Sequence, residues 1–167
     1  FILSRPAEFY SETLCHEFVV PVAAPEVAEQ LKEPADFLRV PLFHDDSIKF
    51  LLPALDWTAW FEAAGLGPVP EARRGPRFSN ADHAIDGAME GGGVALARGS
   101  LAERDVTAGR LVIPLPLGLS LGGQFCFVCK SGMERDRRVA TFLAWLREEV
   151  QAVDALSARL TLHPLPA

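Results

Sequence analysis

The clearest pattern in the chain is a helical one over residues 81–89, where apolar side chains recur at positions 81, 84, 85, 88 and 89. This spacing places them on one face of an amphipathic helix. Ser79 or Asn80 can cap its free N–H groups, and a run of three glycines ends it. Residues 77–78 and 94–96 read as flanking strands. The pattern predicts a βαβ unit with a polar turn after its first strand, and ligands bind at such turns in open α/β sheets.

The same patterns predict the other elements. Short apolar runs predict strands at residues 14–23, 41–43, 111–114 and 125–129. Helical spacing and terminal signals predict helices at residues 25–31, 33–38, 56–64, 101–108 and 139–150. Strands that alternate with helices indicate an α/β fold with a mostly parallel sheet.

Details at the ends of these elements add further expectations. Asp56 and Asp136 are placed to cap two helices, and Ser100 with Glu103 forms a capping box for the helix at 101–108. Residues 116–123 read as a loop, and the tail at 160–167 as loose chain. One helical stripe is aromatic, and we assign it to packing rather than to ligand binding: Trp57, Trp60 and Phe61.

Composition and charge narrow the class of protein. The chain has 167 residues, of which 49% are hydrophobic and 23% charged, so it can bury a real core as one domain or two small lobes. Its net charge of -6 argues against nucleic-acid binding by this chain itself. It contains neither an apolar run of about 20 residues nor a signal-peptide pattern. The first residue is not Met, which indicates a fragment of a longer protein.

Candidate chemistry is sparse. Cys126 and Cys129 form a CxxC within an apparent strand, where they point to opposite faces, so we interpret them as small core residues. His44 precedes two aspartates and reads as part of a solvated loop. No residues stand at the spacing of a metal site, a phosphate loop or a hydrolase nucleophile. We therefore expect neither a metal nor a cofactor, and no enzymatic activity.

Eight motifs, taken together and in order, resemble those of LysR-type transcriptional regulators. The Trp-x-x-Trp helix and the His-Asp-Asp-Ser run are most similar to the branch that contains the glycine-cleavage activator and the β-lactamase regulator. The eight motifs cover nearly the whole chain, at residues 21–25, 34–38, 41–47, 57–65, 75–79, 91–98, 109–114 and 142–149.

The resemblance implies a fold of the periplasmic-binding-protein type 2, with two α/β lobes joined by crossing strands and the first lobe incomplete. Residues 1–18 would be the remnant of the first lobe and a crossing strand. Residues 19–128 would form the second lobe, and residues 129–167 would return to the first. The resemblance further implies a cytoplasmic homodimer or tetramer without membrane contact, which meets DNA only through an N-terminal winged helix-turn-helix missing here.

The resemblance also implies a small effector in the cleft between the lobes, such as an amino acid, a small carboxylate or a cell-wall fragment. The polar turn after residues 77–78 would face this cleft, and a helix N-terminus there suits a carboxylate. Ser79 and Asn80 can equally serve only as caps. The candidate ligand-binding residues are Arg77, Phe78, Ser79, Asn80, Gln124, Phe125 and Arg5.

Two other classes remain open from the sequence. The same fold serves solute-binding proteins of transporters, which would carry a cleavable signal peptide upstream of Phe1. A small α/β enzyme is the third class, and it would need a metal site or a nucleophile such as Ser79.

Overall fold

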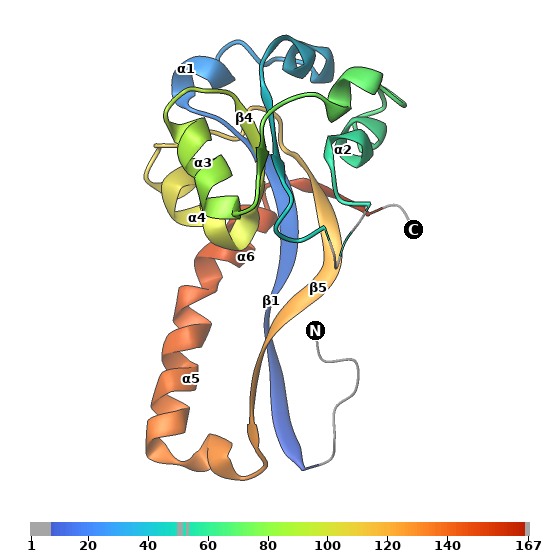
Figure 1. Cartoon of the computed structure of the whole chain (residues 1–167). Coiled ribbons are helices and arrows are strands. Elements are labelled where there is room, and N and C mark those ends of the chain that lie inside the picture. Colours follow the sequence, from blue (N-terminus) through green and yellow to red (C-terminus); the bar gives the residue numbers. More distant parts are fainter. Residues whose placement is uncertain (1–7, 50–51, 53, 166–167) are drawn as a thin grey trace.

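A computed structural model describes residues 8–49, 52 and 54–165 (Figure 1). Its centre is a six-stranded mixed sheet with the strand order β3-β2-β4-β1-β5-β6. The pairings β3–β2, β2–β4 and β5–β6 are parallel, whereas β1 runs antiparallel to both of its neighbours. The predicted α/β class with a mostly parallel sheet is confirmed.

The strands are β1 (Phe9–Val22), β2 (Leu42–Asp45), β3 (Arg77–Phe78), β4 (Val94–Arg98), β5 (Leu117–Lys130) and β6 (Thr161–Pro164). The α-helices are α1 (Pro25–Ala28), α2 (Trp57–Ala63), α3 (Ala81–Met89), α4 (Gly99–Thr107), α5 (Arg137–Glu149) and α6 (Gln151–Ser157). The described residues also form the 3-10 turns η1 (Pro34–Arg39), η2 (Pro70–Arg73) and η3 (Met133–Arg135).

The molecule consists of a globular unit and a long extension (Figure 1). Strands β1 and β5 are 14 residues each and run through both parts, so that their outer halves form a two-stranded ribbon beyond the rest of the sheet. Helix α5 runs beside this ribbon and brings the chain back to the globular unit, where α6 and β6 follow (Figure 1).

Alternating side chains of β1 divide the globular unit into two cores, one on each face of the sheet. Val19 belongs to the core with α2, whereas Phe18 and Val20 belong to the core with α3, α4 and α6. The α2 core contains an aromatic cluster in which Trp60 and Phe61 are fully buried and Trp57 nearly so. The packing role predicted for these three side chains is confirmed.

Helix α4 begins in a way that the sequence did not reveal. Arg98 occupies its N-cap position without a side-chain cap, and the predicted capping box between Ser100 and Glu103 is wrong. The buried carboxylate of Glu17 on β1 takes its place, because it accepts hydrogen bonds from the backbone N–H of Ser100, at 3.2 Å, and from its hydroxyl. A residue 83 positions away thus satisfies the helix start.

Three further expectations are corrected by the sheet. Residues 111–114 form only an isolated antiparallel bridge, between Val112 and Ala23, which is the residue just after the end of β1. Most of the predicted loop at 116–123 is instead the first half of β5, which begins at Leu117. The tail is ordered through residue 164, since β6 pairs in parallel with β5 from Thr161 to Pro164.

The predicted caps of Asp56 and Asp136 are confirmed, because Asp56 accepts from the backbone N–H of Ala59 and Asp136 from that of Arg138. Cys126 and Cys129 lie in β5 as predicted, but both are half-buried rather than enclosed in a core.

An ion pair fastens α5 to the ribbon. The guanidinium of Arg147 donates to both carboxylate oxygens of Glu12 on β1, at 2.6 and 2.7 Å, and the Tyr10 hydroxyl donates to the same carboxylate. Arg147 and then Tyr10 hold the pKa of Glu12 at about 2, against an ordinary value of 4.5. The pair therefore stabilises the folded chain above pH 4.5, and its contribution disappears as the pH falls from 4.5 to about 2.

We expect Glu12→Gln to lower the free energy of unfolding by about 0.5–1 kcal/mol at pH 7, because the pair is partly solvated. The difference from wild type should vanish as the pH approaches 2. Urea unfolding at several pH values measures it. Glu149→Gln is the matched control, since Glu149 is exposed on α5 and forms no ion pair within the described part of the chain. A difference that stays constant from pH 7 to 2 would contradict the assignment.

Candidate functional site

The carboxyl ends of β3, β2 and β4 lie side by side at one edge of the sheet. Parallel pairing aligns His44 with Arg77 and Asp45 with Phe78, and it aligns Phe43 with Ala95 on the other side. Because β4 is antiparallel to β1, and β1 starts in the extension, these carboxyl ends face the extension. The polar residues that follow the three strands therefore gather on this side of the globular unit.

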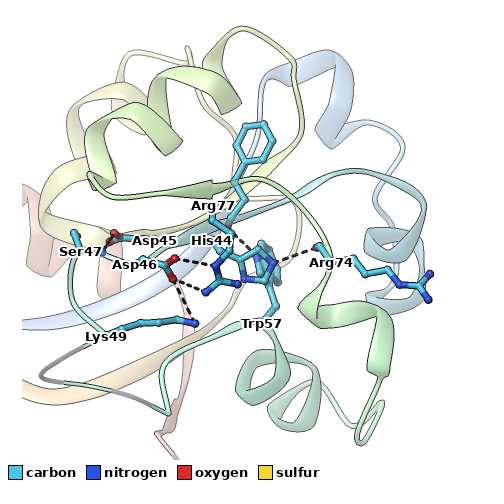
Figure 2. A network of polar contacts seen from close by, with 9 residues as sticks. His44, Asp45, Asp46, Ser47, Lys49, Trp57, Arg74 and Arg77 are labelled. Carbon is cyan, nitrogen blue, oxygen red and sulfur yellow. Dashed lines mark hydrogen bonds and ion pairs between the residues drawn. The ribbon is translucent and has the colours of Figure 1, made fainter.

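His44 is part of the strand and not of a solvated loop, so the sequence interpretation was wrong. It is 4% exposed, and its Nε2 lies 3.1 Å from the carbonyl oxygen of Arg74. Burial lowers the pKa of His44 below 6.5. His44 is hence uncharged at neutral pH, and its ring ties β2 to the segment that leads into β3 (Figure 2).

A charged cluster covers the edge next to His44 (Figure 2). The guanidinium of Arg77 donates to both carboxylate oxygens of Asp46, at 2.8 and 2.5 Å, and the Lys49 ammonium lies 3.4 Å from the same carboxylate. Arg77 is the main reason why the pKa of Asp46 lies below 3.8. Asp46 is therefore ionised at neutral pH and connects β2 to β3.

A small pocket opens between β2 and β4 at this edge. Its apolar walls come from both strands, from β1 and from the start of α2, and its polar lining carries both positive and negative groups. The lining residues are Val19, Phe43, His44, Asp45, Lys49, Leu55, Asp56, Trp57, Leu96 and Arg98. The cavity volume is about 20 Å³, which admits one small group rather than a whole metabolite.

Four of the predicted ligand-binding residues come together at the same edge. Arg77 and Phe78 form β3, and the Phe78 ring lies 5.2 Å from the Phe43 ring, measured between centroids. Ser79 is exposed in the turn. The Asn80 side chain accepts from the backbone N–H of Asp82 at 2.8 Å, so Asn80 is the residue that caps α3.

Two of the other predicted residues lie elsewhere. Gln124 and Phe125 are exposed on β5, opposite His16 and Cys15 of β1, and neither lines the pocket. Arg5 lies outside the described residues.

The pocket residues Lys49 and Arg98 are absent from the sequence-based set. Arg98 carries a usable signal, because it is the last residue of a strand that leads directly into a helix, and such positions surround ligands in open α/β sheets. Lys49 offers no comparable signal, since the turn that places it depends on Asp46.

None of the helices in the described ranges is both long and apolar enough to span a membrane.

Comparisons with known proteins give a consistent result. Residues 2–151 match the LysR substrate binding domain family. The chain is 36% identical over 141 residues to an uncharacterized HTH-type transcriptional regulator of Sinorhizobium fredii, covering 83% of this chain and 45% of the relative. It is 31% identical over 144 residues to the glycine cleavage system transcriptional activator of Escherichia coli, covering 84% of this chain and 45% of that protein. The chain thus spans about half the length of these relatives.

Among solved structures, the effector domain of the transcriptional regulator AmpR of Pseudomonas aeruginosa superposes with a TM-score of 0.63 at 25% identity. The match covers 94% of this chain and 72% of that domain. It confirms the predicted periplasmic-binding-protein-like fold and the resemblance to this branch of regulators. The chain belongs to the LysR substrate-binding domain family.

Proposed function

We propose that this chain is the ligand-sensing regulatory domain of a bacterial LysR-type transcription factor. The observation that carries the proposal is the polar edge at the carboxyl ends of β2, β3 and β4, which contains a pocket and faces the extension. In this interpretation, the globular unit is the second lobe and the extension belongs to the first. A small metabolite bound between them biases how the complete protein presents its DNA-binding modules.

The surface of the extension supports this assignment. Phe125 on the ribbon and Phe142 and Trp145 on α5 are each 46–50% exposed, which is unusual for such large apolar side chains. The chain covers 72% of the AmpR effector domain, so that domain contains further elements. We propose that the corresponding part of the first lobe covers these aromatic side chains.

The partners follow from the same proposal. The effector is a small molecule such as an amino acid, a small carboxylate or a cell-wall fragment. The complete protein acts in the cytoplasm as a homodimer or tetramer. It meets DNA through a winged helix-turn-helix, because the net charge of -6 on this chain disfavours contact with phosphates. The relatives are transcriptional regulators rather than enzymes.

A thermal-shift screen of the complete regulator against amino acids, small carboxylates and cell-wall fragments tests the proposal. An effector at about 100 times its Kd should add about 2.7 kcal/mol of stability and change the affinity for operator DNA. Ser79→Ala should weaken this response, whereas Thr107→Ala, on the exposed end of α4, should leave it unchanged. A sensing role would be contradicted if every compound that stabilises the protein left its affinity for operator DNA unchanged.

A further inference from the structure

Arg98 places a positive charge in the pocket, and no residue that the structure describes forms an ion pair with it. Its Nε is buried and makes no hydrogen bond, and no carboxylate among the described residues lies within the 4.0 Å of an ion pair. The residues outside the described ranges carry no acidic side chain. Most buried polar groups have a partner, so this unpaired donor needs an explanation.

The neighbouring carboxylates are already engaged. Asp45 accepts from the backbone N–H of Ser47 at 2.8 Å, and Asp56 accepts from that of Ala59 at 3.1 Å as the cap of α2. Asp46 is held by Arg77, and the buried Glu17 accepts from Ser100. Asp45 and Asp56 line the pocket together with Arg98, but each serves another contact in the fold and neither lies within 4.0 Å of its guanidinium.

The pocket around Arg98 has room for one small group, and its charged lining consists of Lys49 and Arg98 together with Asp45 and Asp56. Antiparallel pairing with Val19 fixes the backbone of Arg98 at the end of β4. Phe43, Trp57 and Leu96 contribute apolar wall, which strengthens an electrostatic contact by excluding water. The Trp57 indole N–H donates to the carbonyl of Phe43 at 2.9 Å, so this wall is held in place. A cavity volume of about 20 Å³ accommodates a planar carboxylate group but not a bulky one.

We propose that Arg98 is the residue that binds the carboxylate group of the effector, in the pocket between β2 and β4. The planar guanidinium donates in parallel to the two carboxylate oxygens, an arrangement that Arg forms readily. The remainder of the effector extends out of the pocket over the turn at residues 78–80. The inference rests on the proposed sensing function and adds the chemical class of the ligand and its anchoring residue.

Titration of the chain with sodium acetate, glycine or inorganic phosphate, followed by the ¹H–¹⁵N signal of the Arg98 Nε–H group, tests the pocket directly. Sodium chloride keeps the ionic strength constant. We expect saturable shifts of the Arg98 and Trp57 side-chain signals with acetate and glycine, and only weak shifts with phosphate. Arg98→Gln should raise the Kd about 10- to 100-fold. Arg104→Gln, on the exposed side of α4, is the matched control and should bind like wild type.

Several results would overturn the proposal: equal shifts with chloride, tighter binding of phosphate than of acetate, or unchanged acetate affinity in Arg98→Gln. If Arg98→Gln does not fold, the wild-type titration still tests whether acetate binds at Arg98, because the observed signal comes from the Arg98 side chain. Measuring the operator affinity of the complete regulator with and without a carboxylate distinguishes failure of the Arg98 proposal from failure of the proposed sensing function. A carboxylate response that survives Arg98→Gln contradicts the pocket but not the sensing function. Acetate binding at Arg98 without any carboxylate response contradicts the sensing function but not the pocket.

Discussion

Gly75→Ala is expected to lower the free energy of unfolding by about 2–4 kcal/mol and to disturb the edge that contains the pocket. Gly75 has a φ of +132°, and a methyl group at this position would lie 2.0 Å from the backbone oxygen of Leu42. Backbone of a buried strand cannot move aside as a flexible side chain does. The adjacent carbonyls of Arg74 and Pro76 contact the ring and the backbone N–H of His44, so the strain would reach β2.

The matched control for this variant is Gly67→Ala. Gly67 also has a positive φ, of +76°, but nothing lies within 4 Å of an added methyl group. Gly67→Ala should lower the free energy of unfolding by only about 1 kcal/mol, because its cost is limited to placing an alanine at a positive φ. Urea unfolding followed by circular dichroism compares the two. Equal losses of stability would show that the close approach of Gly75 to Leu42 carries no cost of its own.

Trp60→Ala is expected to lower the free energy of unfolding by about 3–5 kcal/mol, because it removes a fully buried indole. The Trp60 ring lies 4.8 Å from Phe37 and 5.2 Å from Phe61, measured between ring centroids. Its N–H donates to the carbonyl of Leu117 at 3.0 Å, at the start of β5. The substitution therefore leaves a cavity beneath α2 and a buried acceptor without its donor.

Trp145→Ala supplies the comparison on α5. Trp145 is 49% exposed and contacts Phe142, at 5.6 Å between ring centroids. Its removal should cost about 1 kcal/mol or less. Chemical unfolding monitored by circular dichroism avoids the loss of the fluorophore. A comparable cost for both tryptophans would mean that α2 is not a main contributor to the core.

Local patterns predicted the elements whose signals lie within a few residues. The apolar spacing of α3, the Asn80 cap and the glycines after the helix are contained in one short segment, and the structure has all three. The charged cluster around His44 shows where prediction from neighbouring residues fails. His44 stands beside two aspartates, which is typical of a loop, yet parallel pairing with β3 and the carbonyl of Arg74 enclose it. Its burial depends on a segment 30 residues away.

The candidate site also combines residues that local patterns predict with residues whose role depends on distant contacts. The turn at residues 78–80 was predictable, because a polar turn between a strand and a helix is a local feature. Arg98 also stands at a local signal, the end of a strand that leads into a helix, but its role depends on which acids reach it. Glu17 and Asp56 serve helices α4 and α2, while Asp46 is held by Arg77 from β3. Only the assembled sheet shows that these acids make other contacts and that Arg98 forms no ion pair within the described ranges.

By itself, the sequence determined the α/β class, the βαβ unit around α3 and the membership of the LysR effector domains, because periodicity, caps and ordered motifs are properties of neighbouring residues. Tertiary structure alone decided that the chain after residue 116 forms the long strand β5 and that the tail adds β6 beside it. It also decided that His44 is buried and that Arg98 lies in a pocket with a buried Nε that makes no hydrogen bond. Strand pairing and ion pairing depend on contacts between residues that are far apart in the sequence, and local sequence patterns therefore do not predict them.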